Sequence, residues 1–199
     1  MTGKRTSLKY NLDRSRTGDS YSYYDMAHGV DGYVAMFEAT GDEGYLDEAL
    51  GRLIDNAISD ATPSLTLGPL AFKDSYKGWI SHHSEVAGQE VAFYESYLWR
   101  YVCRLVRALR SNKSTYGQSG YRRQYDAILA FTEANIFDKW YVRGVDRYIY
   151  RQNTNMAAHW AYVALHLRLH TNDAVRQARC YTIHNTSRQS SCRIIGERP

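Results

Sequence analysis

Apolar residues recur with helical spacing along most of this 199-residue chain, and this pattern limits the chain to a fold built from helices. Apolar side chains three or four positions apart lie on one face of a helix. Five segments show the spacing: 26–37, 46–58, 93–109, 125–136 and 160–167. No segment alternates apolar and polar residues over a useful length, and only 3 prolines are present. The sequence therefore predicts an all-α protein.

Two of these segments belong to a repeat. The run YVAMFEATGDEGYLDEA begins at Tyr33, and YVALHLRLHTNDAVRQA begins at Tyr162. Each passes from an apolar helix through a polar break that contains an Asp into a second helix. A weaker copy spans 85–140, with its break at 111–119. Because a repeat sets the architecture of the whole chain, we expect antiparallel helical hairpins, two of them complete and a third begun. An ordinary antiparallel bundle is the alternative.

Local signals predict where these helices begin and end. Gly41 suits a helix C-terminus and Asp42 the following N-cap, and Ser84 before Glu85 indicates the start of the third long helix. Residues 179–199 lack a helical apolar stripe and are rich in Arg, Ser and Cys. We therefore expect a helical domain over residues 1–178, followed by a poorly ordered or atypical tail.

The lengths of the apolar runs and the first residues of the chain indicate whether the protein enters a membrane or carries a signal peptide. No apolar run reaches the length of a membrane span, and the first residues lack the apolar segment of a signal peptide. We expect a soluble chain with no membrane partner, and the compartment stays open. The basic residues are spread widely, with a net charge of only +4, so nucleic acid is not an expected partner either.

One stretch carries a family resemblance. The run YDMAHGVDGYVAMFEATGDEGYLDEA, which begins at Tyr24, resembles the hairpin of (α/α) toroid carbohydrate-active enzymes. Those enzymes include alginate and heparin lyases, uronyl hydrolases and several glycosidases. The turn TGD-x-x-Y-L at 40–46 is the most recognisable part, and the resemblance covers about residues 20–175. It implies an incomplete (α/α) toroid, since closed toroids have more than twice as many hairpins.

An open arc of hairpins exposes apolar flanks at both ends, which is unfavourable in water. Two hypotheses account for it. Either two chains associate as a homodimer that buries the flanks, or the chain is a fragment whose parent closes the ring.

The hairpin topology also predicts which connections lie together. In up-and-down helices every second connection is at the same end. The segment before the first helix therefore lies beside the 60–84 and 139–154 connections, and these are long and rich in aromatic and polar residues. The 18 tyrosines suit a wet groove that stacks flat ligands. We expect this end to be the binding end.

The resemblance implies β-elimination on an acidic, uronate-containing polysaccharide, without a cofactor. This reaction needs a group that neutralises the uronate carboxylate, a base and an acid. From the predicted binding end we expect Asn153 or Asn155 as neutraliser, His83 or His159 as base, and Tyr148 or Tyr150 as acid. The expected substrate-binding residues are Tyr24, Trp79, His82, Trp140, Arg143 and Arg151.

Each assignment has a structural alternative. Asn153 and Asn155 stand where a helix N-cap is expected, and His159 lies one turn into a helix, where a core histidine is common. Trp79 and Trp140 can equally belong to the core. No His, Asp or Glu group has metal-ligand spacing, so no metal is expected.

Two other functions stay open. A glycosidase needs two carboxyl groups that flank the scissile bond, and the candidates are Asp25, Glu85 and Asp146. A module that binds carbohydrate or protein without cleaving it is the second alternative, because missing hairpins would remove part of the groove wall.

Overall fold

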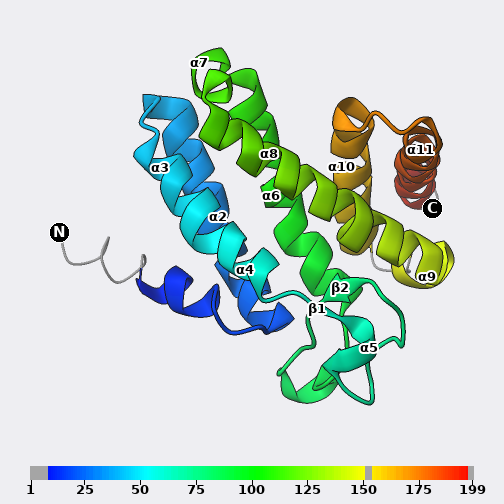
Figure 1. The fold of residues 1–199 in the computed structure, drawn as a ribbon. Coiled ribbons are helices and arrows are strands. Elements are labelled where there is room, and N and C mark those ends of the chain that lie inside the picture. Colours follow the sequence, from blue (N-terminus) through cyan, green and yellow to red (C-terminus); the bar gives the residue numbers. More distant parts are fainter. Residues whose placement is uncertain (1–8, 151–153, 197–199) are drawn as a thin grey trace.

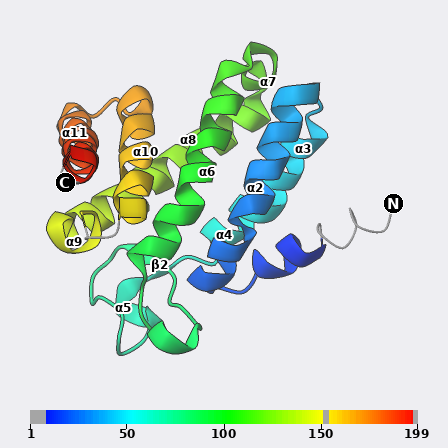
Figure 2. The ribbon, with the colours of Figure 1, turned by 180° about the vertical axis from the view of Figure 1, so that it is seen from behind.

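A computed structural model describes residues 9–150 and 154–196, and helices make up most of them (Figure 1). This confirms the predicted all-α class. Three long helices lie side by side in one layer: α2 (Ser20–Thr40), α6 (Ala92–Ser111) and α10 (Thr154–His170). Figure 2 shows the same layer from behind, with α6 between its two neighbours. In the described residues no helix is both long and apolar enough to cross a membrane.

Returning segments follow each long helix and pack against the layer. After α2 come α3 (Gly44–Asp47), the π-helical η1 (Glu48–Ile54) and α4 (Asp55–Ser59). After α6 come α7 (Lys113–Gly117), α8 (Ser119–Phe131), the π-helical η3 (Thr132–Asp138) and α9 (Lys139–Tyr148). After α10 comes α11 (Ala174–Gly196). The described chain therefore forms three antiparallel hairpins, one more than the two complete hairpins that we expected.

Helix α11 completes the third hairpin. Helical structure continues to Gly196, beyond residue 178, where we expected a poorly ordered or atypical tail. Cys180 and Ile183 of this helix are fully buried, and Arg176 forms ion pairs with Asp138 and Glu133 of η3. Apolar residues in this stretch are sparse, so the sequence shows no stripe. Cys180, Ile183 and the ion pairs of Arg176 hold the helix against the rest of the structure.

The helix ends agree only in part with the sequence signals. Asp19 caps α2, because its carboxylate accepts hydrogen bonds from the backbone N–H groups of Tyr21 and Ser22. Gly41 ends α2 with φ 72°, as predicted. Helix α6 begins at Ala92, so the predicted start at Ser84 is wrong.

Between residues 84 and 92 the chain is not an α-helix. Ser84–Val86 form a single 3-10 turn, η2. Gly88 then adopts φ 78°, a conformation that interrupts a helix.

The connection after η3 also differs from expectation. We expected a loop over 139–154, but α9 continues the helix to Tyr148. Gly144, with φ 135° and ψ 107°, breaks the helical geometry inside it and turns the chain. Apolar and aromatic residues are frequent in this stretch, and burial of Trp140 and Ile149 accounts for its order.

The long connection that we expected over 60–84 extends to residue 91. It contains the short antiparallel strands β1 (Thr62–Pro63) and β2 (Lys77–Gly78), and the helix α5 (Ser64–Leu67). It lies at the end of the molecule where α2, α6 and α10 begin (Figure 1). Two hydrogen bonds tie it to the start of α2. Ser20 N donates to Ile80 O at 3.1 Å, and His82 N donates to the carboxylate of the N-cap residue Asp19 at 3.0 Å.

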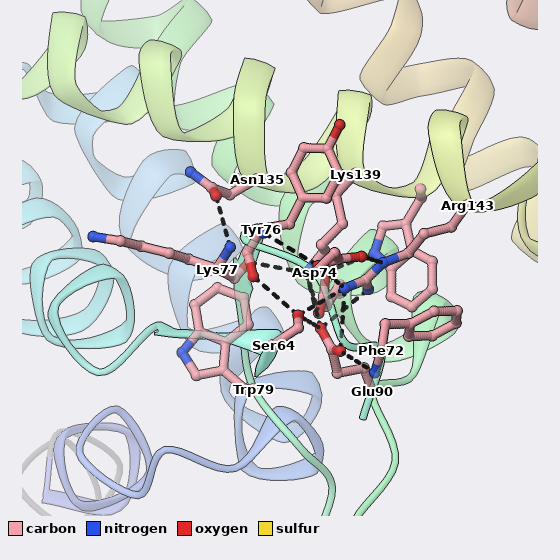
Figure 3. A network of polar contacts seen from close by, with 12 residues as sticks. Ser64, Phe72, Asp74, Tyr76, Lys77, Trp79, Glu90, Asn135, Lys139 and Arg143 are labelled. Carbon is pink, nitrogen blue, oxygen red and sulfur yellow. Dashed lines mark hydrogen bonds and ion pairs between the residues drawn. The ribbon is translucent and has the colours of Figure 1, made fainter. Parts of the chain in front are cut away.

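A buried network of charges fastens segment 60–91 to α6 and α9 (Figure 3). The Arg143 guanidinium donates two hydrogen bonds of 2.9 Å to the Asp74 carboxylate and a third, of 3.1 Å, to Glu90. Lys139 Nζ lies 2.8 Å from Glu95, whose other oxygen accepts a 2.7 Å hydrogen bond from Trp140 Nε1.

Further contacts extend this network. Ser64 Oγ and the Phe72 backbone N–H both donate to Glu90. A Cβ added at Gly78 would lie 2.6 Å from Lys139 Nζ and 2.9 Å from Glu90 Oε1, so a larger residue there would displace side chains of the network. The network is therefore closed on itself, with side chains from three separate stretches of the chain.

Replacing Arg143 with Met should destabilise the fold by about 3–5 kcal/mol, because the buried Glu90 would lose its nearest cation and keep only Lys139, at 3.8 Å. Arg143 has a side-chain exposure of 3%, whereas Arg52 is 61% exposed and pairs with Glu48 on one helix. The matched control Arg52→Met should cost less than about 1 kcal/mol. Urea unfolding followed by circular dichroism measures both, and equal losses would contradict a structural role for the network.

Candidate functional site

A pocket of about 430 Å³ opens on the layer of long helices, and all three contribute to it. Its lining residues are Asp31 from α2, Arg100, Tyr101 and Arg104 from α6, and Ala158, His159 and Tyr162 from α10. The core-facing side of α6 carries Leu98, Val102 and Leu105, all buried. The same helix therefore holds the core with one face and lines the pocket with the other.

Arg100 is the distinctive group of this pocket. Its guanidinium carbon lies 4.3 Å from the ring centroid of Tyr97 and 4.4 Å from that of Tyr101, whose hydroxyl accepts a hydrogen bond from it. Its Nε is buried and has no hydrogen-bond partner. Across the described ranges no carboxylate forms an ion pair with Arg100. A half-buried cation without a counter-ion favours an anionic ligand.

His159 lies beside Arg100 and is almost fully buried, with 5% exposure. Its ring stacks on Phe93 at 5.7 Å and meets the edge of Tyr97 at 5.2 Å, and its Nδ1 is buried without a hydrogen-bond partner. Burial, and then the positive charge of Arg100, lower the pKa of His159 to about 4. The imidazole is therefore neutral at neutral pH, and its protonation is less favourable than that of an ordinary histidine.

A row of aromatic side chains continues from the pocket towards segment 60–91. Tyr97 and Tyr24 rings lie 4.3 Å apart, and Tyr24 contacts Phe93 and Tyr94. Tyr21 closes the row against His83 at 4.5 Å. Burial raises the pKa values of Tyr24 and Tyr94 above their ordinary value, so both are neutral phenols at neutral pH.

One tyrosine of this row has a further polar contact. The Tyr97 hydroxyl lies 2.8 Å from Nε2 of the exposed His28. The hydroxyl of a half-buried aromatic row is thereby linked to a side chain at the surface.

The other charges of the pocket are balanced. Arg104 forms ion pairs with Asp31 and Glu38 of α2, and these contacts hold α2 against α6. A larger hollow of about 640 Å³ lies around Tyr121, between α4 and α8. There Asp47 accepts from Tyr121 at 2.7 Å and Asp55 from Gln124 at 3.3 Å, so its carboxylates already have partners. We therefore take the Arg100 pocket as the candidate site.

The structure brings three of the predicted residues to this surface. His159 lines the pocket, Tyr24 belongs to the aromatic row, and His83 lies at the end of that row. His82 is exposed nearby. Asn155 is exposed in the first turn of α10, and Arg151 and Asn153 lie outside the described residues.

Three other predicted site residues are buried in the core or in the charge network. Trp79 and Trp140 are 1% and 0% exposed, so neither offers a ring face to a sugar. Arg143 is held by Asp74 and Glu90, which leaves it unable to clamp a substrate carboxylate. The substrate-binding roles that we expected for the two tryptophans and for Arg143 are therefore corrected. Their side chains are buried, which their places in predicted loops did not indicate.

The two tyrosines expected as acids also lie in packed positions. Tyr148 packs against Phe72 and Trp140, at 5.5 and 5.2 Å between ring centroids. The hydroxyl of Tyr150 donates to the Thr182 carbonyl of α11 at 3.4 Å. These contacts are with the core and α11, away from the residues that line the pocket.

Sequence reasoning missed Arg100, Tyr97 and Tyr101. Both tyrosines fit the apolar stripe of the helix, and Arg100 resembles an ordinary solvent-facing charge. The available signal was the spacing of Tyr97, Tyr101 and Arg104 at positions i, i+4 and i+7, which defines a second face of α6 beside the aliphatic one.

Comparisons with known proteins yielded no match to a family model, a curated protein or a solved structure. Within the residues that the structure describes, no group of three or more His, Cys, Asp or Glu side chains is arranged to hold a metal ion. The site is therefore interpreted from its own geometry.

The lowered pKa of His159 predicts a stability change with pH. Its pKa of about 4 lies below the ordinary 6.5, so the unfolded chain binds more protons between these values. Stability from this group is complete above pH 6.5 and is lost as the pH falls towards 4, by roughly 2–3 kcal/mol at pH 4.5.

Urea unfolding at pH 7 and pH 4.5 measures this loss. His159→Phe should lose less stability between the two pH values than the unchanged chain, and the exposed control His82→Phe should lose as much. An equal loss for all three would contradict the buried, neutral imidazole.

Proposed function

We propose that this chain binds an acidic, uronate-containing polysaccharide in the pocket between α2, α6 and α10 and cleaves it by β-elimination. The observation that carries the proposal is the Arg100 guanidinium, which lacks a carboxylate partner in the described residues and lies beside a neutral histidine and two tyrosines. A uronate carboxylate supplies the missing negative charge through paired hydrogen bonds.

Residues of the pocket, and Tyr97 and His28 beside it, suit each step of the reaction. Arg100 neutralises the carboxylate, which makes the proton on C5 more acidic. His159 takes that proton, and the electron pair of the C–H bond forms the C4–C5 double bond as the C4–O bond to the next sugar breaks. The departing oxygen takes a proton from Tyr97, whose hydroxyl is re-protonated through His28.

A glycosidase and a binding module are the two alternative functions, and the side chains of the same surface distinguish them. A glycosidase needs two available carboxyl groups. Asp25 is paired with Arg14 at 2.9 Å, and the pocket carboxylate Asp31 is paired with Arg104. Glu85 and Asp146 are exposed, on η2 and α9. Binding without cleavage is the second candidate, and the 5% exposure of His159 favours it.

Product formation separates these functions. On incubation with alginate, pectate or a glycosaminoglycan, we expect ultraviolet absorbance from the unsaturated product. Arg100→Gln and His159→Gln should each lower turnover by about 10²-fold or more, since each removes a group that acts on developing charge. The exposed control Arg52→Gln should leave turnover unchanged.

Each other outcome has a meaning. New reducing ends without the absorbance would indicate a hydrolase and contradict the elimination. Polymer binding without either signal would identify a binding module. Absence of both binding and product would overturn the proposal.

We also propose that the hairpins form an incomplete (α/α) toroid. Support comes from three long helices in one layer, each followed by a returning segment. In this proposal a homodimer covers the open flanks of the arc. Analytical ultracentrifugation should give a concentration-dependent dimer, and a stable monomer that does not aggregate would contradict it.

A further inference from the structure

Helices α2 and α6 run side by side in the same direction, and their facing residues meet in a regular register (Figure 2). Asp31 and Arg104 form an ion pair and are 73 residues apart in the chain. Three more pairs have the same separation, and their ring centroids lie 5.3, 4.3 and 5.8 Å apart: Tyr21 and Tyr94, Tyr24 and Tyr97, and His28 and Tyr101. We call these four pairs the α2–α6 ladder.

The ladder lies at the surface of the layer of long helices. None of its residues is fully buried, and His28 is exposed. Residues between them on the two helices, such as Met26 and Leu98, are buried in the core. The ladder is therefore the solvent-facing seam of the two helices, and Arg100 lies beside it, in contact with two of its rings.

The end of the ladder at which both helices begin is made of phenol groups. Tyr21, Tyr24 and Tyr94 present half-buried rings there. Within residues 9–150 and 154–196 the hydroxyls of these three tyrosines have no hydrogen-bond partner. The Tyr97 and Tyr101 hydroxyls, in contrast, are engaged by neighbouring side chains. Phenol groups of this kind suit sugars, because the ring packs against C–H groups and the hydroxyl exchanges hydrogen bonds with sugar hydroxyls.

The opposite end of the ladder is closed by ion pairs. Arg104 is held by Asp31 and Glu38, so its charge is already balanced. The two carboxylates are unfavourable neighbours for an acidic polymer. A polymer that places a uronate at Arg100 therefore extends more favourably towards the three tyrosines.

We infer that the polysaccharide lies along the α2–α6 ladder, with one uronate at Arg100 and further sugar rings over the three tyrosines. The inference rests on the proposed function and adds the direction of the substrate and two substrate-binding residues, Tyr21 and Tyr94. Segment 60–91 bounds this track, because its His83 contacts Tyr21 at 4.5 Å. Affinity should therefore rise with the length of the oligosaccharide until the track is filled.

A sugar polymer fits the ladder better than a single-stranded nucleic acid does. A nucleic acid carries a charge at every nucleotide and needs a basic surface along its length. The ladder contains a single arginine, Arg104, which is paired with two carboxylates. Its phenol groups bind sugar hydroxyls without a positive charge.

Titration calorimetry with uronate oligosaccharides of increasing length tests the inference. A hexasaccharide should bind more tightly than a disaccharide. Tyr21→Ala and Tyr94→Ala should each weaken hexasaccharide binding about tenfold, through loss of a ring contact and a hydrogen bond, and leave disaccharide binding unchanged. Tyr116→Ala is the matched control and should change neither affinity, because Tyr116 is a half-buried tyrosine of α7 that contacts Tyr125 at 5.2 Å, away from the ladder.

A second variant keeps the packing of the ladder. Tyr21→Phe combined with Tyr94→Phe retains both rings and removes only the hydroxyls. It decides the question if the alanine variants lose their helical circular dichroism. It should weaken hexasaccharide binding about fivefold, the effect of lost neutral hydrogen bonds, and an unchanged affinity would then overturn the inference.

The outcomes separate this inference from the proposed function. If Arg100→Gln weakens both ligands and the folded tyrosine variants weaken neither, the track is wrong and the proposed function stands. Tyrosine variants that weaken both ligands equally would also overturn the track, because the rings would then belong to the pocket.

Two further results go beyond the track. If Arg100→Gln weakens neither ligand, the proposed function fails and the inference falls with it. A single-stranded oligonucleotide that displaces the hexasaccharide, with an affinity that depends on Tyr94, would overturn the assignment to a polysaccharide.

Discussion

The placement of α6 between α2 and α10 is the constraint on which the rest of the structure depends. One face of this helix packs Leu98, Val102 and Leu105 into the core, while the other presents Tyr97, Arg100 and Tyr101. Burial of the aliphatic face fixes the rotation of the helix, and the direction of the polar face follows from it. The pocket is thus a consequence of core packing, and its residues keep their positions without belonging to a loop.

Arginine has two different roles in this molecule. Arg143 is enclosed by Asp74 and Glu90, so its charge is used entirely to hold segment 60–91 against α9. Arg100 is stacked between two phenol rings and has no carboxylate partner in the described residues. The burial of an unpaired charge is unfavourable unless a ligand completes it. The charge of Arg143 is therefore used within the fold, whereas that of Arg100 is available to a ligand.

The sequence predicted the helices well and the site poorly. Periodic apolar residues indicated α2, α6 and α10, and Gly41 marked the end of α2 because its left-handed conformation is local. The burial of Trp79 and Trp140 depends on partners far along the chain, such as Glu95 for Trp140. The same holds for Arg100, whose importance lies in the absence of a partner, and no local pattern reports such an absence.

The central claim is that the pocket recognises a carboxylate through Arg100. Calorimetric titration with a uronate oligosaccharide, and with the same oligosaccharide after reduction of its carboxyl groups to alcohols, tests the claim most directly. The account predicts binding of the acidic form only, with heat that disappears in an Arg100→Gln variant that retains its helical circular dichroism. Equal affinity for the acidic and the reduced oligosaccharide would contradict it.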